Sequence, residues 1–131
     1  MFNPLVSTPI VKIQDPKIEK MGVKLFLKRE DLTDPYISGN KFRKLKYNLI
    51  EAREKGYDTL LTFGGAYSNH IHALAYAGHK FVFKTIGIIR GEETLALNPT
   101  LKDAKAFGMD LHYVSRANYR NKDNSDFIDD L

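Results

Sequence analysis

A lysine in the first turn of a predicted helix is the residue of this chain best suited to covalent chemistry. In the stretch Ser38-Gly39-Asn40-Lys41-Phe42-Arg43-Lys44, a glycine-containing loop runs into a helix that carries Lys41 and Lys44 near its start. A helix N-terminus bears about half a positive charge, so an ammonium group there is disfavoured by some tenths of a kcal/mol. The same repulsion favours the neutral amine, which is the nucleophilic form of a lysine. The alternative is that both lysines are solvated surface charges.

A second stretch has the layout of an anion-binding site. Gly64-Gly65-Ala66-Tyr67-Ser68-Asn69-His70 lies between a predicted buried strand and a predicted helix. The glycines allow a ligand to approach the backbone, and Ser68 and Asn69 offer polar groups at the positive end of the helix dipole. The alternative is that Ser68 only caps the helix. The spacing matches neither a phosphate-binding loop nor a dinucleotide fingerprint, and it leaves Tyr67 unassigned.

Metal and thiol chemistry are not expected from this sequence. The chain has no cysteine, which excludes disulfides, thiolate metal sites and a cysteine nucleophile. His70 and His72 are two residues apart, so on a helix they point to different sides and cannot share a metal ion. His79 and His112 have no evident partners and are expected at the surface or half-buried.

Length and composition indicate one globular domain. The chain has 131 residues, of which 43% are hydrophobic and 27% charged, and it lacks low-complexity tracts. It starts without a secretion signal and contains no run of about 20 apolar residues, which predicts a cytoplasmic protein that does not cross a membrane.

Charge is unevenly distributed along the chain, whose net charge is +4. Residues 1–57 carry twelve Lys or Arg against seven Asp or Glu. The basic helix that starts at the first lysine stretch also has an apolar stripe, formed by Phe42, Leu45, Leu49 and Ala52. This pattern indicates an amphipathic helix of a packed fold rather than a nucleic-acid partner.

Strands and helices are predicted to alternate. Prolines at positions 4, 9 and 16 favour an extended arm over 1–22, with a short turn near Asp15-Pro16. Strands are expected at 23–28, 58–63, 85–89 and 111–114, and helices at 40–55, from Ser68 and from Asn98-Pro99 to Gly108. This order predicts an α/β fold with a parallel sheet and helices on both faces, in which 58–63 is buried on both sides. The stretch around Lys41 and the stretch from Gly64 to His70 then both lie in strand-to-helix connections. These connections are at the carboxyl ends of strands, where such sheets bind ligands.

Three motifs carry a resemblance to a known family. Leu27-Lys28-Arg29-Glu30-Asp31-Leu32, Gly39-Asn40-Lys41-Phe42-Arg43-Lys44 and the stretch from Gly64 to His70 resemble the 1-aminocyclopropane-1-carboxylate deaminase and D-cysteine desulfhydrase family. This family belongs to the tryptophan-synthase-beta-like enzymes that use pyridoxal phosphate. The likeness covers nearly the whole chain, with the motifs in the same order and spacing.

The resemblance implies a role for each matching residue. Lys41 matches the lysine that holds pyridoxal phosphate as a Schiff base, and Lys44 matches a residue near its phosphate. Ser68 and Asn69 match the pair that contacts the substrate carboxylate and the cofactor ring, with the serine also catalytic, and His70 is expected on the substrate side. The implied substrate is a small amino acid, either D-cysteine or 1-aminocyclopropane-1-carboxylate, and the full-length enzyme is expected to be a homodimer. The alternative is a cofactor-free α/β domain that binds an anion or another ligand.

The chain departs from this family in its length. Family members continue well beyond residue 131, and their further part supplies the phosphate cradle, the partner of the pyridine nitrogen and catalytic tyrosines. The last residues, about 124–131, resemble the start of a helix. We therefore expect residues 1–131 to be the amino-terminal part of an enzyme domain, with an arm at 1–22, βα units at 23–115 and no useful activity alone.

Overall fold

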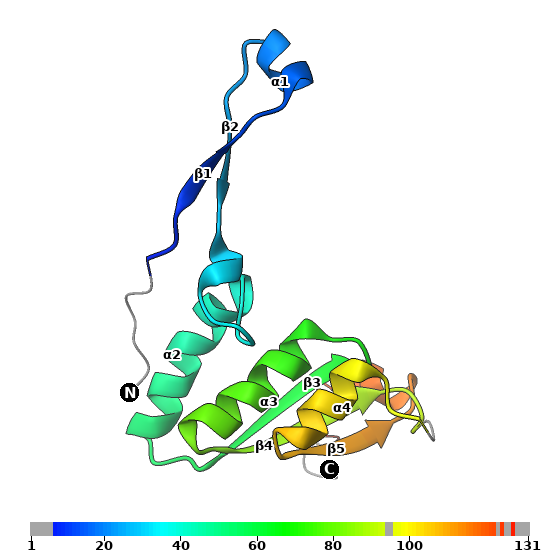
Figure 1. Ribbon diagram of the computed structural model, residues 1–131. Helices are drawn as coiled ribbons and strands as arrows, with labels where there is room; N and C mark the ends of the chain where they lie inside the picture. The colour runs from blue at the N-terminus through cyan, green and yellow to red at the C-terminus, as the bar shows by residue number, and fades with distance from the viewer. Residues whose placement is uncertain (1–6, 94–95, 123, 125–126, 128–131) are drawn as a thin grey trace.

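The computed structural model describes residues 7–93, 96–122, 124 and 127. A body of helices and strands carries a hairpin that projects away from it (Figure 1). The elements of the body are η1 (Glu30–Leu32), α2 (Asn40–Glu54), β3 (Thr59–Gly65), α3 (Asn69–Phe81), β4 (Lys84–Arg90), α4 (Pro99–Ala106), β5 (Met109–Val114) and η2 (Asn118–Asn121). The helix predicted near 124–131 lies outside the described residues, apart from positions 124 and 127.

The body is built on a parallel sheet with the strand order β3-β4-β5. Thr59 pairs with Lys84 and Gly65 with Arg90, and the register continues from Thr85 to Met109. α3 packs over β3 and β4, and α4 packs over β5, on the same side of the sheet. The predicted α/β class with a parallel sheet is confirmed.

Local sequence signals set the helix boundaries. The Ser68 hydroxyl caps α3, and the Asn98 side chain caps α4 by accepting a hydrogen bond from the Leu101 amide at 3.1 Å. α2 ends at Glu54, and Gly56 follows with a φ of +74°, the left-handed conformation that glycine adopts readily after a helix. These boundaries agree with the sequence prediction.

Small residues bring α3 very close to the sheet. A Cβ atom on Gly78 would lie 2.4 Å from Thr85 Cγ2, and one on Gly87 would lie 2.8 Å from Met109 Sδ. The core therefore has no room for a methyl group at either position. Fully buried Ile71 of α3 lies close to Gly87, since a Cβ atom there would be 3.5 Å from Ile71 Cδ1. This close packing holds α3 against β4.

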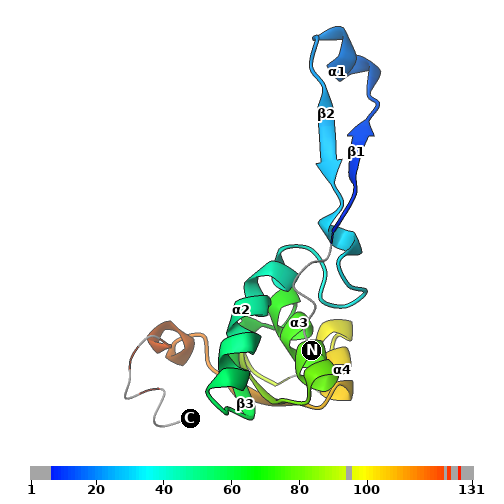
Figure 2. The same cartoon turned by 90° about the vertical axis from the view of Figure 1, so that its left-hand side faces the viewer.

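The N-terminal segment forms an antiparallel hairpin. β1 (Ile10–Ile13) pairs with β2 (Leu25–Lys28), and the short helix α1 (Pro16–Lys20) lies between them at the tip. We call β1, α1 and β2 the hairpin. Figures 1 and 2 show that it stands away from the helices of the body. The strand predicted at 23–28 therefore belongs with the arm rather than with the βα units, because its ladder partner is β1.

A network of polar side chains joins the hairpin to the body through Glu30. The Arg43 guanidinium of α2 donates to both carboxylate oxygens of Glu30, at 2.9 and 3.1 Å. The Thr8 hydroxyl donates to the same carboxylate at 2.9 Å, and Lys28 Nζ lies 3.2 Å from it. Hydrogen bonds from Arg43 foremost, then from Thr8 and Lys28, lower the pKa of Glu30 to about 2 although burial opposes the shift. Glu30 is thus ionised at neutral pH and held by three donors.

The second face of the sheet is less covered than the sequence predicted. Leu61 of β3 is 45% exposed, so this strand is not buried on both faces. On that face the described residues supply only the short helix η2, whose Tyr119 ring lies 6.0 Å from the ring of Phe63. The central strand β4 is buried, with Ile88 and Ile89 each 1% exposed. The prediction of burial is therefore wrong for β3, because this strand lies at the edge of the sheet.

Candidate active site

The backbone around Gly39 places Lys41 at the start of α2. Gly39 is the N-cap residue, with φ +61° and ψ −142°, a conformation that is strained for residues with a side chain. Its amide donates to the Glu30 carbonyl at 2.8 Å. α2 starts at Asn40, so half-buried Lys41 lies in the first turn and exposed Lys44 lies about one turn later.

The start of α3 lies at the carboxyl end of β3. Ser68 Oγ accepts hydrogen bonds from the amides of His70 at 3.2 Å and Ile71 at 3.4 Å. The capping role of Ser68 is therefore real. The described residues supply no acceptor for its hydroxyl hydrogen, which leaves this hydrogen available to a ligand.

The two glycines before this helix have different surroundings. A Cβ atom on Gly64 would lie 2.5 Å from Ile71 Cγ1 and 3.0 Å from Ser68 Cβ. A Cβ atom on Gly65 would meet only Arg90 Nη2, at 3.8 Å. Gly64 is thus needed for packing, whereas the backbone at Gly65 is open to a ligand.

Lys41 and Asn69 line one hollow of about 350 Å³, which we call the lysine hollow. It lies between the loop before α2 and the first turns of α3. The other lining residues are Pro35, Tyr36, Ser38, Gly39, Asn40, His72 and Ala73. The structure thus brings together two residues that lie 28 positions apart in the sequence, as expected for a shared site.

Tyr36 and His72 also line this hollow, although no sequence motif selects them for the site. Tyr36 packs on Tyr76 and Phe107, with ring centroids 4.4 and 5.5 Å apart, and His72 lies 5.8 Å from Phe107. The rings of Tyr36 and His72 thus form one wall of the lysine hollow, with Tyr76 and Phe107 packed against them. The dipeptides Asp34-Pro35 and Asn98-Pro99 predict turns, but they do not predict which aromatic side chain will line the hollow.

A buried carboxylate holds the loop that carries Tyr36. Asp34 accepts hydrogen bonds from the amides of Tyr36 at 2.9 Å and Ile37 at 3.0 Å, and its other oxygen pairs with Lys80 at 2.5 Å. Burial acts to raise the pKa of Asp34, but these three donors outweigh it and lower the pKa overall. The loop is therefore tied to the C-terminal turn of α3.

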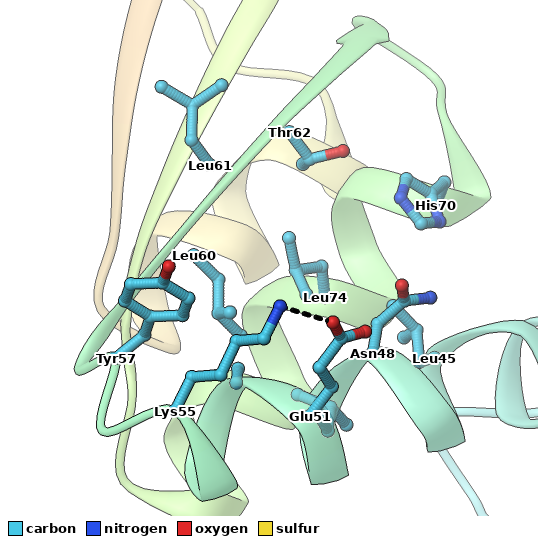
Figure 3. Close-up of a pocket in the computed structure, with 12 residues that line it drawn as sticks. Leu45, Asn48, Glu51, Lys55, Tyr57, Leu60, Leu61, Thr62, His70 and Leu74 are labelled. Atoms are coloured by element: carbon cyan, nitrogen blue, oxygen red, sulfur yellow. Dashed lines mark ion pairs between the residues drawn. The ribbon is translucent and has the colours of Figure 1, made fainter.

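His70 faces a different hollow. It lines a space of about 420 Å³ between α2 and β3, which we call the edge hollow (Figure 3). Burial, and then the positive charges of Lys41 and Lys44, lower the pKa of His70 below its usual value of 6.5. The imidazole is therefore neutral at pH 7, and two lysine charges act on the region where α2 and α3 begin.

His70 and His72 line different hollows, as their spacing predicted. Tyr67 and His112 line neither hollow. Tyr67 is 77% exposed, and His112 pairs with Asp110 at 3.1 Å on the surface. Within the described ranges no three His, Asp or Glu side chains are grouped so that they could hold a metal ion.

Comparison with known proteins gives clear relatives, although no family model matches the chain. A protein of Pyrococcus abyssi assigned as a 1-aminocyclopropane-1-carboxylate deaminase is 42% identical over 93 residues, which cover 70% of this chain and 28% of the relative. The mitochondrial bifunctional D-cysteine desulfhydrase/1-aminocyclopropane-1-carboxylate deaminase of Arabidopsis thaliana is 34% identical over 119 residues, covering 87% and 29%. The chain thus spans under a third of the length of these two relatives.

Solved structures agree with this relationship. The crystal structure of a 1-aminocyclopropane-1-carboxylate deaminase homologue matches 84% of this chain and 33% of its own, with a TM-score of 0.69 and 35% identity. A hydrogen sulfide-producing enzyme from Fusobacterium nucleatum matches 99% of this chain and 42% of its own with a TM-score of 0.70, and at 16% identity it supports the fold alone.

These matches define the fold as tryptophan-synthase-beta-like, with the lysine hollow at the carboxyl end of its parallel strands. Within that class the chain is a homologue of the 1-aminocyclopropane-1-carboxylate deaminase and D-cysteine desulfhydrase family over about a third of those proteins' length. In the part of the chain that the structure describes, no helix is both long and apolar enough to span a membrane.

Proposed function

We propose that this chain supplies the lysine-bearing part of a pyridoxal-phosphate-dependent enzyme that removes ammonia or sulfide from a small amino acid. The observation that carries the proposal is the lysine hollow, where the Lys41 amine and the Asn69 amide lie beside the N-termini of two helices. D-Cysteine and 1-aminocyclopropane-1-carboxylate are the two substrates named for the Arabidopsis relative.

The residues present fit this cofactor in three respects. Half-buried Lys41 offers an amine for covalent attachment inside a hollow that is large enough to admit a small organic group. Lys44 and the positive end of the α3 dipole favour an anion, and the charges of Lys41 and Lys44 contribute, after burial, to the lowered pKa of His70. The open backbone at Gly65 leaves room for a flat ring to approach.

When bound, the cofactor would supply an electron sink for carbanion chemistry. Lys41 would hold it covalently and exchange protons at its own Nζ. Asn69 would orient the group inside the hollow through its side-chain amide. Ser68, fixed by its two capping hydrogen bonds, would offer its hydroxyl hydrogen to the substrate carboxylate. The neutral imidazole of His70, which faces the edge hollow, would contact the substrate only where the substrate reaches that side of the α3 N-terminus.

Reductive trapping tests the assignment of the lysine. The chain is incubated with pyridoxal phosphate, reduced with borohydride and analysed by peptide mapping. We expect the label on Lys41, its loss in Lys41→Arg and its retention in the matched control Lys44→Arg. Label on Lys44, or equal label on many surface lysines, would refute the proposal.

We further propose that the chain alone does not turn over either substrate. It matches under a third of the length of the named relatives. The described residues that line the lysine hollow all come from α2, α3 and the loop before α2. Assays for 2-oxo acid, ammonia and sulfide should detect no enzyme-like rate with the isolated chain. Turnover by the purified chain would overturn this part of the proposal.

A cofactor-free anion-binding domain is the competing function, because the capped N-terminus of α3 alone could hold a carboxylate or phosphate. An ultraviolet-visible spectrum separates the two when the chain is loaded with pyridoxal phosphate and then dialysed against buffer without it. An absorption band above the protein absorption that persists after this dialysis is expected for attachment to a lysine and not for a cofactor-free domain.

A further inference from the structure

The loop that leads into α2 forms one side of the lysine hollow, and α3 forms the other. Tyr36 and Ser38 line the hollow from the loop, and Asn69 and His72 line it from α3. Lys41 lies just after the loop, in the first turn of α2. The way in which the loop is seated on α3 therefore sets the width of the hollow beside the lysine.

Asp34 joins this loop to α3 through a charged contact. Its Oδ1 accepts hydrogen bonds from the amides of Tyr36 at 2.9 Å and Ile37 at 3.0 Å. Its Oδ2 pairs with Lys80 Nζ at 2.5 Å, and the Asp34 side chain is only 5% exposed. Although burial acts to raise the pKa of Asp34, the ammonium and the two amides lower it overall, so the carboxylate is charged at neutral pH. One buried group thus shapes the loop and ties it to the helix.

An aromatic contact seats the loop on the same part of α3. The ring of Tyr36 packs on the ring of Tyr76, with the centroids 4.4 Å apart. Lys80 lies one turn after Tyr76, and its Nζ is 5.8 Å from the centroid of the Tyr76 ring, within the range of a cation–π attraction. Two side chains of the loop, from Asp34 and Tyr36, are therefore held by two side chains of α3 that lie one helical turn apart.

We propose that Asp34 is a positioning residue of the candidate site, which together with Lys80 seats the loop on α3 so that the lysine hollow keeps its width around half-buried Lys41. The inference rests on the proposed role of Lys41, but Asp34 itself does not line the hollow and acts through the loop. A hollow that is formed in advance spares a ligand the cost of ordering the loop. Without the carboxylate, the loop would move away from α3 and Lys41 would become as accessible as a surface lysine.

Lys44 provides an internal reference for this proposal. It lies on α2 three residues after Lys41 and is exposed. Loosening of α2 or of the whole chain would change the reactivity of both lysines, whereas a shift of the loop changes chiefly the surroundings of Lys41. The ratio of the two labelling rates therefore separates a positioning role from a loss of stability.

Two aldehydes test the proposal in the isolated chain. Formaldehyde with cyanoborohydride methylates accessible amines and requires no cofactor site, whereas pyridoxal phosphate with borohydride reports on the hollow. In the unaltered chain we expect formaldehyde to modify Lys41 more slowly than Lys44, and pyridoxal phosphate to label Lys41 faster. Asp34→Ala should move each ratio toward one by about fivefold, a factor that corresponds to the ordering of one or two side chains.

Variants of Lys80 supply the rescue and the controls. Lys80→Met should move both ratios in the same direction, because the buried carboxylate loses its counter-ion, and Lys80→Arg should restore them. The matched control Lys84→Met removes a lysine whose pair with Asp58, 4.0 Å long, is exposed, so it should leave both ratios unchanged. The unaltered chain in urea, brought to the same free energy of unfolding as Asp34→Ala, should also keep its ratios.

Each other outcome is decisive. Equal formaldehyde rates for Lys41 and Lys44 in the unaltered chain, ratios that do not respond to Asp34→Ala, or no recovery in Lys80→Arg would overturn the proposal, as would the same change in Lys84→Met or in urea. If Asp34→Ala does not fold, the Lys80 variants decide, since that side chain is 42% exposed and its replacement spares the core.

The two reagents also separate this proposal from the proposed function. Pyridoxal phosphate label on Lys41 that is the same in Asp34→Ala would overturn the positioning role and leave the proposed function intact. Absence of that label from the unaltered chain, with a formaldehyde ratio that responds to Asp34→Ala as expected, would refute the proposed function and leave the positioning role intact.

Discussion

Replacing Gly64 by alanine should damage the junction of β3 and α3, whereas the same change at Gly65 should not. In Gly64→Ala the new methyl group would lie 2.5 Å from Ile71 Cγ1 and 3.0 Å from Ser68 Cβ. Ile71 is fully buried, so it cannot rotate away without moving α3. At Gly65 the nearest atom is the mobile end of Arg90, 3.8 Å away, and the backbone φ there is ordinary.

The magnitudes follow from these contacts. Forcing an extra methyl group into a packed core costs about 1–3 kcal/mol. For a chain of this size each kcal/mol corresponds to roughly 3–5 °C in the unfolding temperature, so Gly64→Ala should lower the Tm by about 3–15 °C. Gly65→Ala should leave the Tm unchanged or raise it slightly, because alanine restricts the unfolded chain by about 0.4–1 kcal/mol.

Circular dichroism melts of the two variants and the unaltered chain measure this difference. A double-mutant cycle with Ile71→Ala identifies the clash as the cause. Ile71→Ala alone should cost about 2–5 kcal/mol through the cavity it leaves. In the Gly64→Ala background its cost should be smaller by about 1 kcal/mol or more, because the opposing atoms are gone. Equal Tm values for the two glycine variants, or strictly additive costs in the cycle, would refute the reasoning.

Three further outcomes are expected. Since hydrogen bonds from Arg43 foremost hold the pKa of Glu30 at about 2, below the unfolded value of 4.5, this carboxylate stabilises the fold above pH 4.5 and loses that effect as the pH falls toward 2. Glu30→Gln should therefore flatten the acid limb of the stability profile, and an unchanged limb would contradict the assignment. NMR titration should give His70 a pKa below 6.5 that rises toward the usual value in Lys44→Ala, and a pKa that does not respond to this change would exclude the lysine as a cause. Asp34→Ala should lower the free energy of unfolding by about 1–3 kcal/mol by leaving buried donors without an acceptor, with partial recovery in Asp34→Asn, and a change under 0.5 kcal/mol would show that the loop holds without it.

The parts of the fold that depend on neighbouring residues could be predicted from the sequence. The capping groups at Ser68 and Asn98 and the glycine at position 56 mark the helix ends through contacts within four residues. These features are set by local backbone chemistry. The sequence also predicts that Lys41 and Asn69 meet where parallel strands end, but this reason holds only for Asn69, because the strand before Lys41, β2, pairs with β1 in the hairpin and is not part of the parallel sheet.

Features that depend on distant partners could not be predicted in this way. The pairing of β1 with β2 joins segments separated by a helix, and the turn signal at Asp15-Pro16 is in fact the cap and first residue of α1. The presence of Tyr36 and His72 beside Lys41 depends on how the loop packs on α3. The exposure of β3 depends on which strands lie beside it, and a strand's own apolar sequence does not reveal that.

The polar network at the base of the hairpin contacts the chain on both sides of Lys41. The Glu30 carboxylate grips Arg43, two residues after Lys41, while the Glu30 carbonyl holds the amide of Gly39, two residues before it. Glu30 makes both contacts, so a single residue joins the base of the hairpin to the chain on both sides of Lys41.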